Sequence, residues 1–318
     1  MTRPITTESY QSVPPPEMSY AQYLLLMAGV SGSVAAIISA IVAPFKARPV
    51  SHNDWIGLLA ALYPHVASAR TRAAELARRF YDAERALRLG PELIEDLDAP
   101  VPGQLVQVWP RQDVNLAPYE PEWFEESMEN VRENMARLGS TDNDVAQVVN
   151  QALKEVEKGG RTTTRWAADE DQKVLGWARV EGNENVGSCA FCAMLISRGP
   201  VYKYSPENSG LRVDDDVLAV EIWRKAQETG DESHLMSLMN RWHKGCDCKV
   251  VPVFDRSNWT GKDQFEEFEK LWATVTKGET AGNRSKAASS EALNAFRRYL
   301  ETGKREYGTN VLRFPQAA

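Results

Sequence analysis

The four cysteines of this 318-residue chain fall in two tight groups. The first is Cys189-Ala-Phe-Cys192, and the second is His243-Lys-Gly-Cys246-Asp-Cys248. A CxxC turn brings two thiolates to one side of the backbone, and a second close-spaced group roughly fifty residues later can complete a tetrahedron around Zn²⁺. Five side chains therefore compete for four ligand positions. Only one residue separates Cys246 from Cys248, so these two side chains need not both point inward.

Three interpretations of the cysteine groups stay open. A structural zinc site is favoured, with Cys189, Cys192, His243, Cys246 and Cys248 as candidate ligands. Disulfides or a redox pair form the second interpretation, because CxxC also serves thiol exchange, although the sequence offers no thioredoxin-like βαβ frame. In the third, the cysteines are buried by coincidence. A catalytic zinc is disfavoured, since catalytic sites usually keep one position open and use histidine and carboxylate more than thiolate.

Composition limits the classes of protein that can carry such a site. The chain has 37 Lys and Arg against 44 Asp and Glu, which gives a net charge of -7. An acidic chain is not a general nucleic-acid coat protein, so any DNA contact needs a local basic patch. With 43% hydrophobic residues the composition is globular, and the length favours two domains over one. The sequence shows no secretory signal, which argues against a secreted, disulfide-stapled protein.

The N-terminal part contains a long apolar segment. Residues 1–17 are rich in proline and poor in apolar anchors, which predicts a disordered lead. Residues 18–45 carry no charge and predict a helix long enough to span a bilayer. Gly29 and Gly32 favour close approach of another helix. The segment is either a membrane-active helix or a helix covered by a partner protein; the second is preferred, because nothing else in the chain resembles a membrane protein.

A long amphipathic helix is predicted directly after this segment. Ser51 and Asp54 form a short capping box at its start. Apolar residues then recur in alternating steps of four and three, which is a heptad seam. The seam consists of Trp55, Leu59, Leu62, Val66, Ala69, Ala73, Leu76, Phe80, Ala83 and Leu87. Such a seam packs on another helix, either in this chain or in another copy, so self-association through it is one expectation.

The outer face of the same helix is basic. It carries Arg70, Arg72, Arg78, Arg79, Arg85 and Arg88. One interpretation is a strip that binds phosphates, and with it DNA. A solvated face partly paired with Glu75, Asp82 and Glu84 is favoured, because charge runs on helices are usually solvated.

The middle of the chain is predicted to be helical after a proline-rich connector at 90–120. Helices are expected near 124–138 and 142–158, the second stopped by Gly159 and Gly160. A third helix begins near 161 and fades by 176.

The rest of the chain introduces strands. Short strands are predicted at 177–180 and 250–253, and the C-terminal tail contains helices near 263–274 and 290–301 followed by a strand at 310–314. The predicted fold class is therefore mainly α, with long N-terminal helices and a small α+β zinc-knuckle region.

The cysteine region resembles the head-morphogenesis minor capsid family of tailed phages, the group related to the F protein of phage Mu. The resemblance covers roughly residues 120–255. It is carried by Trp177–Ala178–Arg179, Cys189–Ala190–Phe191–Cys192, Gly199, and the run from His243 to Val253. Two departures concern the ligand set: Lys244 and Asp247 stand where the family commonly has Pro and Arg. The span between the knuckles also carries an extra segment, with Asp214–Asp215–Asp216 and a helix expected near 217–228.

The resemblance implies an architectural protein of the virus head with a structural Zn²⁺. Its members are made in the host cytoplasm, enter the prohead in few copies and lie at or near the portal, so the portal protein and the major capsid or scaffold protein are the expected partners. The expected organisation is a lead (1–17), a helical assembly region (18–120), a domain similar to the Mu F family (121–255) and a helical tail (256–318).

A capsid maturation protease is the alternative function, because such enzymes are also encoded among phage head genes. A serine protease needs a nucleophile, a histidine base and an orienting group within hydrogen-bond reach. Of the four histidines, His52 and His65 lie on the heptad helix and His243 belongs to the metal motif, which leaves His234. No GxSxG motif occurs, so an architectural role is preferred.

Overall fold

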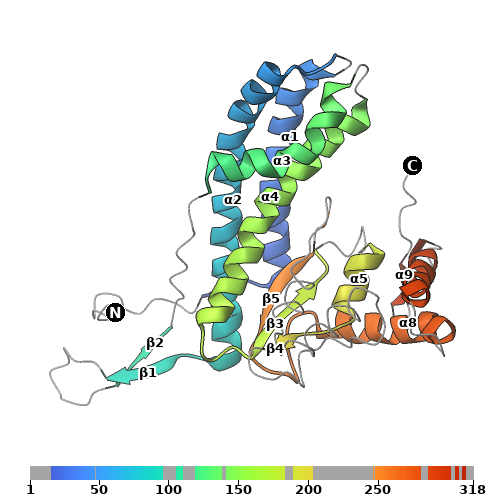
Figure 1. The fold of residues 1–318 in the computed structure, drawn as a ribbon. Coiled ribbons are helices and arrows are strands. Elements are labelled where there is room, and N and C mark those ends of the chain that lie inside the picture. Colours follow the sequence, from blue (N-terminus) through green and yellow to red (C-terminus); the bar gives the residue numbers. More distant parts are fainter. Residues whose placement is uncertain are drawn as a thin grey trace, which may run out of the picture.

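The computed structural model describes residues 16–46, 48–95, 105–109, 119–137, 141–182, 189–202, 246, 248–280, 286–301, 305–307 and 310–312. Helices dominate these residues and accompany a small three-stranded sheet, which confirms the predicted mainly α fold with a small α+β region. Figure 1 shows long helices side by side, with the sheet and shorter helices gathered beside one end of them. The predicted disordered lead, apart from residues 16 and 17, lies outside the described residues.

The uncharged segment forms α1 (Tyr20–Val42), continued by the short 3-10 helix η2 (Ala43–Phe45). Ser19 and Gln22 form a capping box that fixes where α1 begins. One face of α1 is buried and consists of Tyr23, Met27, Val30, Val34, Ile38 and Val42. The opposite face is open to solvent, and Leu25 is 74% exposed. By length and composition alone the stretch Tyr20–Phe45 could cross a membrane, because an 18-residue window within it has a mean hydropathy of 2.2.

The heptad helix is α2 (His52–Leu89), and the predicted capping box of Ser51 and Asp54 is present at its start. The helix continues through Pro64. Its seam is buried by α1 and by a later helix of the same chain, so the apolar stripe is filled within one molecule. Phe80 stacks on Tyr23 of α1 with ring centroids 4.9 Å apart. Leu87 alone among the seam residues is largely exposed, at 71%.

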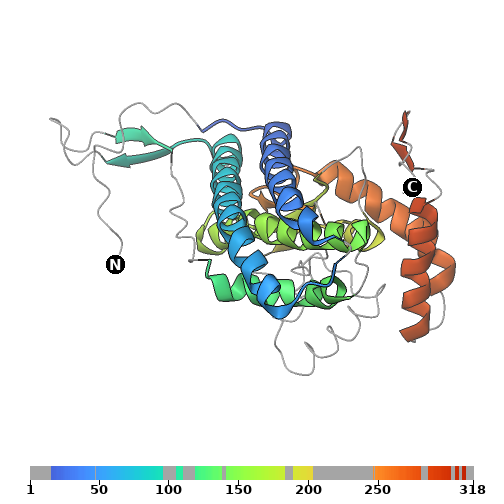
Figure 2. The same cartoon turned by 90° about the horizontal axis from the view of Figure 1, so that it is seen from above.

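The proline-rich stretch after α2 is more than a connector, which corrects the prediction for 90–120. Strands β1 (Glu92–Glu95) and β2 (Leu105–Val108) pair antiparallel as a two-stranded hairpin. Figures 1 and 2 show this hairpin projecting away from the helices. A strand of four residues contains too few alternating polar and apolar positions to be recognised in a proline-rich sequence. Within the described part of the chain, β1 and β2 pair only with each other.

Helices α3 (Pro121–Ala136) and α4 (Asp142–Glu170) complete the bundle, and Figure 2 shows α4 crossing beneath α1 and α2. The predicted stop at Gly159 and Gly160 is wrong, because α4 runs through both residues. A Cβ on Gly159 would lie 2.6 Å from the backbone oxygen of Arg70, and one on Gly160 would lie 3.2 Å from that of Ala73. The two glycines therefore serve the close approach of α4 to α2 rather than the end of a helix.

One hydrophobic core includes residues from both sides of the expected boundary near residue 120. Phe124, Met128 and Val131 of α3 belong to the same buried cluster as Leu62 of α2. Val156 of α4 belongs to it as well. Helices α1 to α4 therefore form one packed unit, which we call the bundle.

The small sheet has the strand order β4-β3-β5 and is antiparallel throughout. Its central strand is β3 (Gly176–Val180), flanked by β4 (Val201–Tyr202) and β5 (Lys249–Val253). These positions confirm the two predicted strands. Helix α5 (Ala190–Ile196) follows β3 and carries the CxxC residues at its start.

The C-terminal tail contains the expected helices, α8 (Lys262–Thr280) and α9 (Lys286–Glu301), and a hairpin of β6 (Arg305–Tyr307) with β7 (Asn310–Leu312). Helices α8 and α9 pack on α5, and Trp272 meets Phe296 edge to face with centroids 5.0 Å apart. The sheet strands, α5, α8 and α9 form the second unit of the fold, which we call the knuckle region. Its buried cluster includes three of the four cysteines and also Tyr81 of α2 and Ala167 of α4, while Val180 and Val251 of the sheet belong to the cluster of the bundle.

Candidate metal centre

The first cysteine group occupies the start of α5. Cys189 is the N-cap residue, and its sulfur accepts a hydrogen bond from the backbone N–H of Cys192 at 3.4 Å. A backbone amide that points at a sulfur is typical of a CxxC metal knuckle and stabilises the thiolate form. Cys192 lies inside the helix and is buried, whereas Cys189 is exposed at the rim.

The second cysteine group lies directly before β5. The backbone there brings both Cys246 and Cys248 inward, and both are buried. Because β5 pairs with β3 over five residue pairs and α5 also packs on β3, the start of β5 is held near α5. The single residue between these two cysteines therefore does not separate their side chains onto opposite faces.

Three sulfur atoms from the two groups converge. The Sγ atoms of Cys192, Cys246 and Cys248 all lie within 4.8 Å of one another, and those of Cys192 and Cys246 are 3.2 Å apart. Tetrahedral zinc with bonds of about 2.3 Å places its sulfur ligands roughly 3.8 Å apart. The cluster therefore has the dimensions of one face of a metal tetrahedron, and all four cysteines are free of disulfides.

The five predicted ligands thus divide into three groups. Cys192, Cys246 and Cys248 are brought together, and Cys189 adjoins them through its contact with Cys192. His243 lies outside the described residues, as do the segment 217–228 and His234.

Crowding of the thiols sets the electrostatics of the cluster. Hydrogen bonds from Cys189, Cys246 and Cys248, followed by burial, raise the pKa of the Cys192 thiol. Several thiolates so close together repel one another, so they can ionise together only if a cation shares the space. The donor set, three soft sulfur atoms that are buried and close together, is of the kind that Zn²⁺ prefers.

Two buried arginines border the cysteines. Arg161 of α4 donates from Nε to the backbone oxygen of Cys248 at 3.0 Å and from Nη2 to that of Cys246 at 2.5 Å. Arg179 of β3 is only 1% exposed. Burial lowers its pKa, while the negative charge of Cys248, Cys192 and Cys246 acts in the opposite direction.

Sequence reasoning assigned no chemistry to either arginine. Arg179 stood within the Trp-Ala-Arg part of the phage resemblance, and its place in a short apolar strand was the available signal of burial. Arg161 was taken as the start of a separate helix, which hid its position on the inner face of α4. A charged residue inside a predicted apolar strand is worth testing as the partner of a nearby site.

A chain of polar contacts joins the metal centre to the bundle. Glu157 of α4 accepts a hydrogen bond from Lys249 of β5 at 2.6 Å and another from Ser31 of α1 at 3.1 Å. Arg161 lies 3.9 Å from the same carboxylate. Residues next to the cysteines are thereby linked through one side chain to both α4 and α1.

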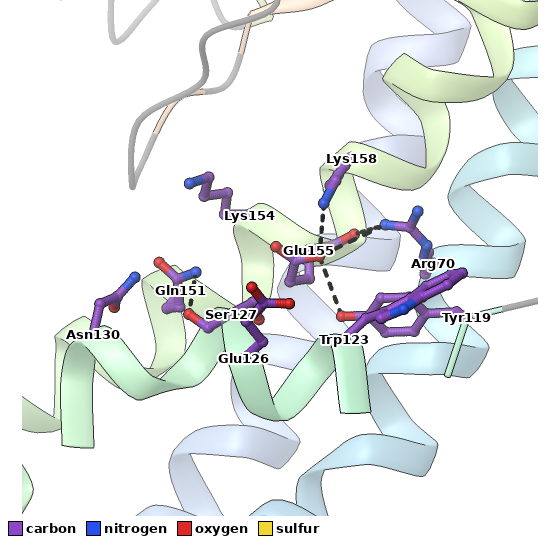
Figure 3. A pocket seen from close by; sticks show the side chains of 10 residues that line it. All are labelled: Arg70, Tyr119, Trp123, Glu126, Ser127, Asn130, Gln151, Lys154, Glu155 and Lys158. Atoms are coloured by element: carbon purple, nitrogen blue, oxygen red, sulfur yellow. Dashed lines mark hydrogen bonds and ion pairs between the residues drawn. The ribbon is translucent and has the colours of Figure 1, made fainter. Parts of the chain in front are cut away.

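A separate polar pocket of about 440 Å³ lies between α3 and α4 (Figure 3). Its deepest charge is Glu155, which contacts Tyr119 at 3.2 Å, Lys158 at 3.7 Å and Arg70 at 3.8 Å. Arg70 also stacks on the ring of Tyr119, 4.4 Å from its centroid. The Glu155 carboxylate forms a hydrogen bond and ion pairs with these neighbours, so the network holds Tyr119 against α2 and α4. The pocket is lined by Arg70, Tyr119, Trp123, Glu126, Ser127, Asn130, Gln151, Lys154, Glu155 and Lys158.

The basic strip of α2 is largely paired within the chain. Four of its six arginines contact carboxylates: Arg70 with Glu155, Arg78 with Asp82, Arg85 with Asp171 and Glu92, and Arg88 with Glu84. Asp82 and Glu84 are two of the three partners predicted from the sequence. This pairing favours the interpretation of a charge-balanced face over that of a phosphate-binding strip.

Comparison with known proteins places the chain among bacteriophage proteins. The family model described as VG15 protein matches residues 20–275, which include the bundle, the sheet and all four cysteines. The chain belongs to this VG15 family.

Two relatives in mycobacteriophages extend over almost the whole chain. The Gene 15 protein of Mycobacterium phage D29 is 33% identical over 292 residues, covering 88% of this chain and 96% of the relative. The Gene 15 protein of Mycobacterium phage L5 is 30% identical over 310 residues, covering 90% of this chain and 97% of the relative. No solved structure matches the chain.

Proposed function

We propose that this phage protein is a minor capsid or head-morphogenesis protein that acts architecturally at or near the portal during prohead assembly. The observation that carries the proposal is the cluster of Cys192, Cys246 and Cys248, formed by a CxxC and a CxC in the order found in the Mu F-like family. Membership of a phage family supports it. The protein would be made in the host cytoplasm and retained in the virion.

The same proposal includes one structural Zn²⁺ held by the cysteines. When bound, the ion joins α5 to the start of β5 and replaces a larger apolar core. Zinc is supported over harder cations, which prefer oxygen ligands, by the three buried sulfurs close together and by the amide of Cys192 that points at the Cys189 sulfur.

The exposed face of α1 is proposed to dock on another protein of the head, the portal, the major capsid or the scaffold protein. An apolar helix face left in water is a hallmark of an interaction site. Leu25, Leu26 and Ile37 are all exposed on this face. A lipid partner is less suitable, because α1 packs with its other face on α2 and α4, whose charged residues would enter the bilayer with it.

A matched pair of surface substitutions tests the docking face. Leu25 on α1 and Leu87 on α2 are 74% and 71% exposed, so a lysine costs little stability at either position. Leu25→Lys should lower incorporation of the protein into proheads, measured by quantitative mass spectrometry of purified heads, and Leu87→Lys should not. Equal incorporation would contradict docking through α1. Loss of vesicle binding by Leu25→Lys with normal incorporation would instead establish a membrane contact.

Co-expression with the major capsid protein separates the architectural role from the alternative of a capsid maturation protease. An architectural protein should co-purify with capsid or portal protein of full length. A protease should shorten the capsid subunit, and substitution of His234 should prevent this. Cleavage that depends on this chain would overturn the proposal.

A further inference from the structure

We propose that the cysteine cluster has a second closed state, a disulfide between Cys192 and Cys246, which a peroxide generates in the metal-free protein by way of the exposed thiol of Cys189. The inference deepens the proposed zinc centre and rests on it only for the statement that bound zinc protects the thiols. The disulfide itself follows from the positions of the sulfur atoms and from the exposure of one of them.

The sulfur atoms of Cys192 and Cys246 come from distant parts of the chain and lie close to bonding distance. They are 3.2 Å apart, although 54 positions separate the two residues. Because the S–S bond of a disulfide is about 2.05 Å long, the two sulfurs need to approach by only about 1 Å. Rotation of a side chain moves its sulfur by more than this, so the bond can form while α5 and β5 keep their places.

Cys248 competes with Cys246 for this bond, since its sulfur also lies within 4.8 Å of the Cys192 sulfur. The backbone of Cys248 is held more tightly, because it directly precedes Lys249, which pairs with Val180 in the ladder between β5 and β3. Cys246 lies two residues earlier and is 7% exposed, against 0% for Cys248. The approach of Cys246 therefore requires the smaller rearrangement.

Cys189 is exposed, whereas the other three cysteines are buried. A peroxide arrives from water and therefore meets the Cys189 thiol first. The Cys189 sulfur accepts a hydrogen bond from the backbone N–H of Cys192 at 3.4 Å, and the two thiols are hydrogen-bonded to each other. Cys189, Cys192 and Cys246 thus form a line of neighbouring sulfurs that leads from the surface into the cluster.

The oxidation proceeds in three balanced steps. Hydrogen peroxide oxidises the Cys189 thiol to a sulfenic acid and is itself reduced to one water. The Cys192 thiol attacks this sulfur, the S–O bond breaks, the thiol proton leaves with the hydroxyl as a second water, and a Cys189–Cys192 disulfide forms. The Cys246 thiol then attacks the Cys192 sulfur, its proton passes to the departing Cys189 sulfur, and the Cys192–Cys246 disulfide remains. In total two thiols lose two electrons and two protons, and one peroxide becomes two waters.

The disulfide connects the same elements as the proposed zinc, namely α5 and the residues before β5. The two closures suit different surroundings, because thiols stay reduced in the cytoplasm, whereas disulfides persist outside the cell. A protein that is assembled in the host and released within a virion, as proposed above, passes from the first surroundings to the second. The cluster keeps the knuckle region closed in both.

The experiment treats the full-length chain with hydrogen peroxide after a chelator has removed the metal, and maps the product by mass spectrometry without reduction. Cleavage after Phe191 separates the first two cysteines, and cleavage before Asp247 separates the last two. We expect a link between Cys192 and Cys246, two remaining thiols per chain, and full reversal by dithiothreitol. Brief treatment in the presence of a dimedone probe should label Cys189 before any other cysteine.

Two cysteine variants form a matched pair, because neither removes a sulfur of the expected bond. Cys189→Ser should slow formation of the disulfide by about 10-fold or more, since it removes the thiol that the peroxide reaches. Cys248→Ser should form the disulfide at a rate close to that of the wild type. Added zinc should slow the oxidation of the wild type, because a sulfur bound to metal is not available as a nucleophile. The dimedone labelling of the wild type tests the entry thiol even if a variant does not fold.

The possible results separate the individual claims. A link from Cys192 to Cys248 would overturn the choice of partner, and a stable Cys189–Cys192 link would overturn the transfer into the cluster. Equal rates for the two variants would overturn the role of Cys189 as the entry thiol. Conversion of Cys189 to sulfinic acid without any disulfide would overturn the inference as a whole. A chain that retains no zinc on dialysis, and that oxidises equally fast with and without added zinc, would contradict the proposed zinc centre and leave the disulfide standing.

Discussion

Buried arginines occur in both units of the molecule, but they face different partners. In the bundle, Arg85 contacts Asp171 at 2.9 Å and Arg70 lies beside Glu155. At the cysteines, by contrast, Arg161 of the bundle donates to the backbone of Cys246 and Cys248, and Arg179 of the knuckle region is buried. A carboxylate is negative at neutral pH in either the loaded or the unloaded protein, whereas a cluster of thiols becomes strongly negative only when a metal draws off its protons.

The bundle and the knuckle region are stabilised in different ways. The bundle contains its own counter-charges and a large apolar core, which begins at Met18 and also takes in Val180 and Val251 of the sheet. The knuckle region has a smaller core in which cysteines occupy central positions. We therefore expect the bundle to fold without zinc and the knuckle region to depend on it.

Cys192→Ser should have the largest effect, because it removes a buried thiol from the proposed zinc site. Thiolate zinc sites contribute on the order of 10 kcal/mol of folding free energy in small domains. Elemental analysis should find that the zinc is lost, and near-ultraviolet circular dichroism should show that Trp177 and Trp272 lose their fixed surroundings. Most of the helical signal should remain; its complete loss would mean that the two units do not fold separately.

Leu62→Asp tests the bundle, and its effect on stability should be the second largest. Leu62 is fully buried in the seam of α2, and an unpaired carboxylate there costs several kcal/mol. Chemical denaturation should show a much lower midpoint for the helical transition. Arg72→Ala on the exposed face of α2 should leave the midpoint unchanged, and similar midpoints for the two variants would argue against a packed seam.

Two substitutions of glycine by alanine should change the stability in opposite directions. One lies at the contact between α4 and α2, and the other is a control at an open position of α1. At Gly159 the new Cβ would meet the backbone oxygen of Arg70 at 2.6 Å, so Gly159→Ala should destabilise the bundle by about 1–3 kcal/mol. At Gly32 in α1 nothing lies within 4 Å, so Gly32→Ala should stabilise by up to about 1 kcal/mol. Thermal melts of both variants measure the difference; a stabilising Gly159→Ala would contradict the close approach.

Ser51→Ala should have the smallest effect of the four. It removes the side chain that caps α2, which costs about 1 kcal/mol. Thermal melting should record a shift of a few degrees with an unchanged zinc content. A loss of zinc from this variant would show that the start of α2 and the metal centre are more strongly coupled than their separation suggests.

Much of the bundle could be predicted from the sequence because its signals are local and periodic. The alternating spacing from Trp55 to Ala83 predicted α2 with its cap, and the absence of charge predicted α1. The break at Gly159 was predicted wrongly, since glycine ends helices in isolated chains but here makes room for a neighbour that the sequence does not reveal.

The cysteine cluster was predictable in its residue types but not in its geometry. The CxxC and CxC spacing pointed to the cysteines whose sulfurs converge, but the order of these motifs gave no distance between them. That both Cys246 and Cys248 turn inward depends on Arg161, which holds their carbonyl groups from a helix far away in the sequence. Interactions of this kind between distant segments leave no periodic pattern, and the same reason hid the hairpin of β1 and β2.

The pairing of β3 with β5 has a consequence for the timing of biosynthesis. Residues 176–180 must wait for residues 249–253 before the sheet can close, and the apolar cluster of the bundle waits for the same strand, because it includes Val251 and Val253 as well as Val156. At about 5–20 residues per second, Cys246 leaves the ribosome several seconds after Val156. During that interval one side of the bundle core is still open, so the arrival of β5 both closes this core and brings the second cysteine group to the first.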